Sequence, residues 1–111
     1  MNGGFVEADT ITLTRHTWLH VAVTRDGSNV VRVFVDGVQG VTTPPTSAGT
    51  IGVPAGGLGI GRDTATNNYF VGKISNLRIV KGTALYTSNF TPSTSPFTTT
   101  SQSATASEVK L

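Results

Sequence analysis

The stretch WLHVAVTRDGSNVVRVFVDGVQG, residues 18–40, decides the fold of this chain. Apolar residues recur at every second position in it, and an Asp-Gly pair follows each of the two apolar runs. Alternation with a period of two is typical of strands, and Asp-Gly is typical of the tight turns that join them. The stretch therefore predicts two antiparallel strands, with Gly27 supplying a positive φ in the first turn. The second strand is apolar on both faces and is expected to be central.

The same periodicity extends outward in both directions. DTITLTRHTW, residues 9–18, predicts an earlier strand with Ile11 and Leu13 on one face and threonines on the other. NNYFVGKISNLRIV, residues 67–80, predicts a late strand whose apolar phase slips by one residue, and a β-bulge near 75–76 would restore it. No long segment has helical periodicity. The sequence thus predicts an all-β protein, an antiparallel β-sandwich.

Length and composition indicate one domain with an unusual tail. The chain has 111 residues, and only 13% of them are charged, whereas about 25% is usual for a soluble domain. Thr, Ser and Pro dominate residues 91–107, a composition typical of a linker. We expect a β-sandwich core over residues 1–90, followed by an extended strap over 91–111 that can end in an edge strand.

Charge and cysteine content exclude several classes of function. The eight Lys and Arg residues are scattered along the sequence, and the net charge is only +2. We therefore expect no basic face of the kind that binds nucleic acid. Because there is no cysteine, disulfides and thiolate metal sites are excluded. MNGGFVEAD lacks the basic and apolar regions of a signal peptide, and no apolar run approaches the ~20 residues of a membrane helix. Neither export by a signal peptide nor a membrane partner is expected.

A series of motifs in fixed order resembles a known family. From about residue 17 to residue 97 the chain contains WLHVAVTRDG, VFVDG, LGIGR, FVGKISNLRIVKGTALY and FTPSTSPF. These motifs are similar to the laminin-G-like, concanavalin A-like lectin/glucanase jelly-roll modules found in phage and marine bacterial surface proteins. The resemblance implies two antiparallel sheets packed face to face, with ligands on the concave face or on rim loops. It also implies eight packing positions: Trp18, Val21, Val23, Phe34, Ile60, Ile74, Leu77 and Ile79.

The resemblance also raises a question about the strand edges. Members of the family usually have ~150–200 residues, within the range of single-domain β-sandwiches. This chain is expected to lack most of the N-terminal strands, and open strand edges favour pairing with another chain. We expect self-association or docking on a partner protein.

The residues that could catalyse hydrolysis are too few. Retaining glycosidases need two carboxyl groups about 5–5.5 Å apart. Glu7 and Asp9 share one face of an early strand, but no second Glu follows on that face, and Glu108 is the only other Glu. His16 and His20 are not spaced as a helical metal pair, and His20 is predicted to be a half-buried packing or hydrogen-bonding residue. We therefore expect no enzymatic activity.

One loop combines polar side chains with an aromatic side chain. Its residues form a possible ligand-binding rim: Arg62, Asp63, Asn67, Asn68 and Tyr69. Tyr69 would be the exposed platform; the alternative is an ordinary loop whose Asn side chains satisfy turns. No cofactor is required, but some laminin-G-like modules bind calcium through loop aspartates, and the resemblance makes Asp63 the candidate calcium ligand.

Two functions remain open at this point. The first is a non-catalytic structural module on a virion surface, a capsid decoration or tail-associated protein that binds further copies or capsid and tail proteins. The alternative is a carbohydrate-binding adhesin or lectin module of a bacterial or viral surface protein, with glycans as its partners. The sequence favours the first through its open edges and the second through its rim loop.

Overall fold

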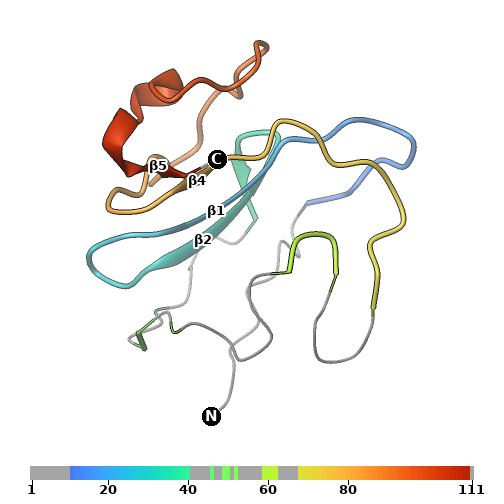
Figure 1. Ribbon diagram of the computed structural model, residues 1–111. Coiled ribbons are helices and arrows are strands. Elements are labelled where there is room, and N and C mark those ends of the chain that lie inside the picture. Colours follow the sequence, from blue (N-terminus) through green and yellow to red (C-terminus); the bar gives the residue numbers. More distant parts are fainter. Residues whose placement is uncertain are drawn as a thin grey trace.

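The described part of the chain forms two small antiparallel sheets (Figure 1). The computed structural model describes residues 11–40, 46, 49–50, 52, 59–62 and 68–110. Its elements are β1 (Val21–Arg25), β2 (Val31–Val35), β3 (Val38–Gln39), β4 (Ile79–Val80), two 3₁₀ turns η1 (Ser101–Ser103) and η2 (Ala106–Glu108), and β5 (Val109–Lys110). The sheet orders are β1-β2-β3 and β4-β5. The all-β prediction is confirmed, and β2 is the central strand of its sheet. In the described part of the chain, no helix has the length and apolarity to cross a membrane.

The predicted hairpin forms, but a different residue makes its first turn. β1 and β2 pair in register from Val21 opposite Val35 to Arg25 opposite Val31. The residue with a positive φ is Asn29, at 63°, so the expectation for Gly27 is wrong. Asparagine tolerates this conformation better than most residues. Its side-chain oxygen also accepts a 2.6 Å hydrogen bond from the Arg25 guanidinium, which fixes the turn.

The second Asp-Gly pair makes the turn between β2 and β3. Asp36 and Gly37 have φ values of 49° and 79°, as a type I′ hairpin requires at both central residues. The carbonyl of Gly37 accepts a hydrogen bond from the Phe90 N–H at 2.9 Å. The turn therefore also attaches the C-terminal part of the chain to the hairpin.

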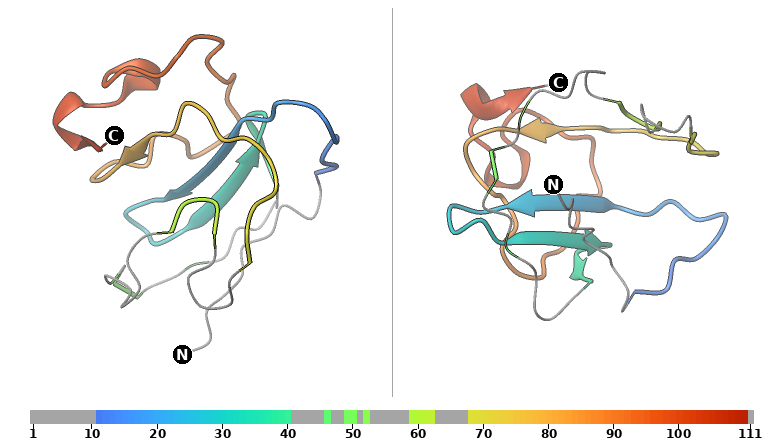
Figure 2. Two further views of the ribbon diagram at one scale, coloured as in Figure 1. Left: turned by 45° about the vertical axis from the view of Figure 1, so that its right-hand side comes forward. Right: turned by 90° about the horizontal axis from the view of Figure 1, so that it is seen from below.

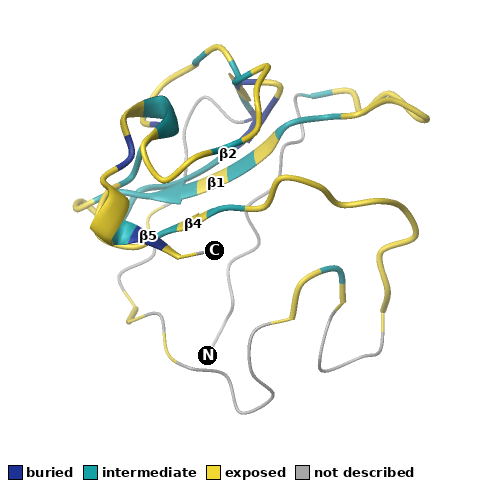
Figure 3. Cartoon of the chain, turned by 45° about the horizontal axis from the view of Figure 1, so that its top comes forward, coloured by how far each residue is buried: buried dark blue, intermediate teal, exposed yellow. Residues whose placement is uncertain are grey.

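The core lies on one face of the hairpin. Phe34 is fully buried there, and residues 84–97 cross this face (Figure 3). The rings of Tyr86 and Phe90 stack with centroids 3.6 Å apart, and both meet the Phe34 ring edge to face. The Thr24 hydroxyl donates to the Tyr86 carbonyl at 2.8 Å. The core is thus an aromatic cluster between the β1–β2 hairpin and a non-regular segment.

On the opposite face of the hairpin the β1 side chains are exposed, although Val35 of β2, which lies on the same face, is buried. Period two sends the side chains of Val21 and Val23 to this face, where they are 62% and 65% exposed. Of the eight predicted packing positions, Phe34 alone is buried. The prediction is wrong for the other seven, which are 39–66% exposed because no described segment packs over them: Trp18, Val21, Val23, Ile60, Ile74, Leu77 and Ile79.

Two further predicted strands differ from the structure. Ile11–Thr14, the described part of the predicted first strand, has no ladder partner, and a turn follows in which His16 has a φ of 60°. The predicted late strand is reduced to β4. Asn76 has a φ of 58° where the apolar phase slips, so the backbone does bend there. However, no described strand pairs with the residues just before β4, so the bend is not a bulge in a ladder.

The hydrogen bonds of Asp26 in the first turn predict how the stability of the fold depends on pH. Asp26 accepts hydrogen bonds from Arg32 at 2.6 Å and from two turn amides. The Arg32 guanidinium is the main cause that lowers the pKa of Asp26 below its ordinary 3.8. Because the folded pKa is the lower one, the Asp26 contribution is complete above pH 3.8 and is lost as the pH falls through the folded pKa. We expect Asp26→Asn to be less stable at neutral pH and to lose less stability on acidification. Urea unfolding between pH 2 and pH 7 measures this, and parallel pH profiles for the two proteins would refute it.

Candidate functional site

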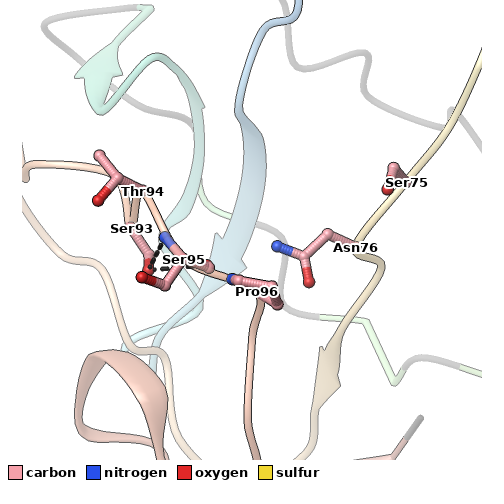
Figure 4. Close-up of a pocket in the computed structure, with 6 residues that line it drawn as sticks. All are labelled: Ser75, Asn76, Ser93, Thr94, Ser95 and Pro96. Carbon is pink, nitrogen blue, oxygen red and sulfur yellow. Dashed lines mark hydrogen bonds between the residues drawn. The ribbon is translucent and has the colours of Figure 1, made fainter.

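An open groove lies where the hairpin meets the C-terminal segment. It has a volume of about 540 Å³. Four separate stretches supply its lining: Trp18–Val21, Asp36, Ser75–Asn76, and Pro92–Thr94 with Phe97. A second hollow of about 390 Å³ shares four of these residues and extends the groove to Ser95 and Pro96 (Figure 4). We call the combined feature the Trp18 groove.

The Trp18 indole contributes an exposed apolar surface to the groove. It is 66% exposed and directly precedes β1. The sequence interpretation placed Trp18 in the core, but the aromatic core is filled by Phe34, Tyr86 and Phe90 instead. An exposed indole offers a flat apolar surface of the kind that interfaces use for stacking. Trp18 therefore gives the groove a platform for a flat or ring-shaped ligand.

Asp36 supplies a carboxylate that is held in place. One of its oxygens accepts a hydrogen bond from the His20 N–H at 2.8 Å, and the Asp36 N–H donates to the His20 carbonyl at the same distance. The other carboxylate oxygen has no partner among the described residues. This oxygen is available to accept hydrogen bonds from ligand hydroxyls.

Asn76 and the strap form the opposite, polar wall. The Asn76 side-chain oxygen accepts from the Phe97 N–H at 2.8 Å, which fixes the amide orientation. Figure 4 shows the amide nitrogen directed across the hollow toward Ser95 and Pro96, and no described residue accepts its hydrogens. The strap is shaped by a turn in which the Ser93 hydroxyl accepts from the Ser95 N–H at 3.2 Å. The amide, and the exposed Thr94 on the strap side of the hollow, are free to bind a polar ligand.

His20 forms an aromatic part of the groove lining. Its ring meets the rings of Tyr86, Phe90 and Phe97 edge to face, with centroid distances of 5.5–6.3 Å. Burial lowers the pKa of His20 below 6.5, and the positive charge of Arg78 lowers it further against the opposing effect of Asp36. Burial therefore disfavours the charged form of the His20 ring. Its buried Nδ1 has no hydrogen-bond partner among the described residues, and the half-buried packing role predicted for this residue agrees with its surroundings.

The predicted rim loop is only partly described. Arg62 and Tyr69 face each other in an isolated antiparallel bridge, next to a 2.8 Å hydrogen bond from the Phe70 N–H to the Gly61 carbonyl. Arg62, Asn68 and Tyr69 are exposed, Tyr69 by 64%. Asp63 and Asn67 lie outside the described residues. The bridge brings Arg62 and Tyr69 together, and the remainder of the rim hypothesis stays a prediction.

A metal site or a glycosidase needs several carboxylates close together, and the described residues of the groove do not provide them. The described residues contain no cluster of three His, Asp or Glu side chains suited to a metal ion. Asp63, the predicted calcium ligand, is outside them, as are Glu7 and Asp9. Asp36 is the one carboxylate among the described groove residues, and Glu108 accepts a hydrogen bond from Thr83 elsewhere in the fold. The described groove therefore lacks the carboxyl pair that glycoside hydrolysis uses.

Comparison with known proteins identifies the family. Residues 2–88 match the family model described as the Concanavalin A-like lectin/glucanases superfamily. The chain belongs to this superfamily, and its antiparallel sheets fit the β-sandwich that the resemblance implied. No curated protein and no solved structure matches the chain. Since the superfamily includes lectins and glucanases, membership is compatible with a carbohydrate-binding or a structural module.

Proposed function

We propose that this protein is a non-catalytic glycan-binding module and that it binds a saccharide in the Trp18 groove. The observation that carries the proposal is the 66% exposed Trp18 indole beside unpaired polar groups. Binding sites combine an apolar or aromatic surface with a few placed polar groups. The single carboxylate among the described groove residues favours binding over hydrolysis.

The groove chemistry favours a neutral sugar. The apolar face of a pyranose ring would stack on Trp18, while its hydroxyls donate to the free oxygen of Asp36 and accept from the Asn76 amide. An acidic sugar would be repelled by Asp36. Arg78, which stacks on the groove residue Phe97, lies 4.4 Å from the centre of that ring and donates to the Ser101 carbonyl, so it is already engaged.

Replacing Trp18 tests this proposal. We expect Trp18→Ala to weaken binding of the best glycan on an array by at least ~30-fold, equivalent to about 2 kcal/mol, because truncating a central aromatic anchor typically has this effect. Tyr69→Ala is the matched control, since Tyr69 is equally exposed but lies outside the groove. Calorimetric titration of both variants with that glycan gives the affinities.

The outcomes separate the two predicted sites. Loss in Tyr69→Ala with full binding in Trp18→Ala would place the site on the rim loop. If the wild-type protein binds no neutral glycan, the proposal is wrong. Far-UV circular dichroism of each variant verifies that the hairpin still folds.

The structural role predicted from the sequence is the second candidate. It is favoured by the exposed apolar side chains of the sheet face, which are suited to contact with another protein. A virion-surface protein of this type would bind capsid or tail proteins, or further copies of itself. Co-purification with particles, without any affinity for glycans, would favour this role over the first.

A further inference from the structure

The outer edge of β1 has no partner strand in the described part of the chain. Hydrogen bonds from the Asp36 N–H to the His20 carbonyl and from the Asp26 N–H to the Val30 carbonyl show that the even-numbered residues of this strand direct their N–H and C=O groups toward β2. In an antiparallel ladder the intervening residues point their N–H and C=O groups to the other side. Those of Val21 and Val23 meet no partner among the described residues. An edge strand of this kind is a template for a further strand.

β4 runs alongside this open edge in the same direction as β1, as the arrows in Figures 1 and 2 show. β1 is antiparallel to β2, and β4 is antiparallel to β5. An additional strand that paired with the outer edge of β1 and ran opposite to it would therefore extend the antiparallel sheet on the side where β4 lies. We call this position the strand seat.

The side chains that border the strand seat, from β1 and from the residues at β4, are apolar on one common face. Arg78 points toward the strap, since its guanidinium donates to Ser101 and covers the Phe97 ring. Its neighbours Leu77 and Ile79 therefore point the other way, toward the face that carries Val21 and Val23. These side chains are 49%, 39%, 62% and 65% exposed, in that order. A strand in the seat would cover them if its apolar side chains were on the same face.

We propose that the seat is filled by Ile11–Thr14 of a second copy of this chain. This segment alternates Ile and Leu with Thr, yet it has no ladder partner, and Leu13 is 60% exposed. With Ile11 and Leu13 on the valine face, Thr12 and Thr14 would lie on the face that carries Thr24 and the Phe34 ring. The segment carries no charge, so no unpaired charge would be buried in the seat.

A second copy suits the seat better than the chain's own segment. In Figure 2 the chain before β1 continues past the end of the sheet, rather than along the seat. Exchange between two copies is reciprocal and closes with twofold symmetry. Both seats then contribute to one interface. The surface buried in the two seats together has to reach the ~1,200 Å² that a stable interface buries.

Cysteine crosslinking tests this exchange, and the chain has no cysteine of its own. Leu13→Cys and Val23→Cys are prepared separately, mixed and oxidised under mild conditions. We expect a disulfide-linked heterodimer at least tenfold more abundant than in a mixture of Leu13→Cys with Val71→Cys, whose side chain is 96% exposed outside the seat. Sedimentation of the wild-type chain is expected to show a dimer, and Leu13→Asp is expected to shift it to monomer.

Three results would overturn the proposal. A disulfide within one chain of the Leu13→Cys/Val23→Cys variant at high dilution would place the segment in its own seat. Efficient crosslinking of Val23→Cys to itself would mean that β1 pairs with β1 of the second copy. A wild-type monomer at all concentrations, with no crosslinking above the control, would leave the seat without this occupant. None of these measurements depends on glycan binding.

Discussion

Phe34→Ala is expected to lower the free energy of unfolding by about 3–5 kcal/mol, the usual effect of deleting a buried phenylalanine ring. Phe34 is the one large side chain with no exposed area in the described part of the chain. Its ring meets those of Tyr86 and Phe90, so removal would leave a cavity where the hairpin and the C-terminal segment join. A domain of this size has a total stability of about 5–15 kcal/mol. The variant is therefore expected to be close to unfolding at 37 °C.

Phe70→Ala provides the matched control, since the same atoms are removed from a side chain that is 60% exposed. We expect its effect to be below about 1 kcal/mol. Urea unfolding followed by circular dichroism gives both values. Equal effects of the two substitutions would mean that the aromatic cluster is not the core of the fold.

The sequence predicted the hairpin because the information for it is local. Alternation and the second Asp-Gly turn lie within 18–40, and they are sufficient to define β1, β2 and the turn at Asp36. Alternation does not show which face is covered. Val21 and Phe34 are equally apolar, but only Phe34 faces residues 84–97, and that contact joins segments far apart in the chain.

The candidate site was harder to predict for the same reason. The sequence pointed to the loop that contains Arg62 and Tyr69, where polar and aromatic residues are neighbours in the chain. The Trp18 groove is assembled from four separate stretches, which no local pattern connects. Two signals were available nevertheless. The phase slip indicated a special role for Asn76, and the second Asp-Gly pair did so for Asp36. That both residues line one groove depends on contacts with the strap, such as the hydrogen bond from the Phe97 N–H to Asn76.

Gly37→Ala is expected to destabilise the protein by roughly 2–4 kcal/mol. A left-handed φ of 79° at this position costs an alanine about 1–2 kcal/mol, and an added Cβ would also collide with the Phe90 carbonyl. Relief of that collision requires Phe90 to move, which weakens its 2.9 Å hydrogen bond to the Gly37 carbonyl and its stack on Tyr86. Because Pro92 also lies against this position, the strap wall of the Trp18 groove would shift as well. Thermal unfolding measures the first effect, and glycan titration at a temperature where the variant is folded measures the second.

The matched control is Gly27→Ala in the first Asp-Gly turn. Gly27 has no positive φ, and an added Cβ would meet no atom within 4 Å. Alanine there restricts the unfolded chain without straining the folded one, so we expect a change between zero and about 1 kcal/mol in favour of the variant. The two Asp-Gly pairs thus respond differently. Gly37 is needed for its positive φ and for its close contact with Phe90 and Pro92, whereas Gly27 has neither of these features. Similar destabilisation by both substitutions would show that the strap does not dock at Gly37.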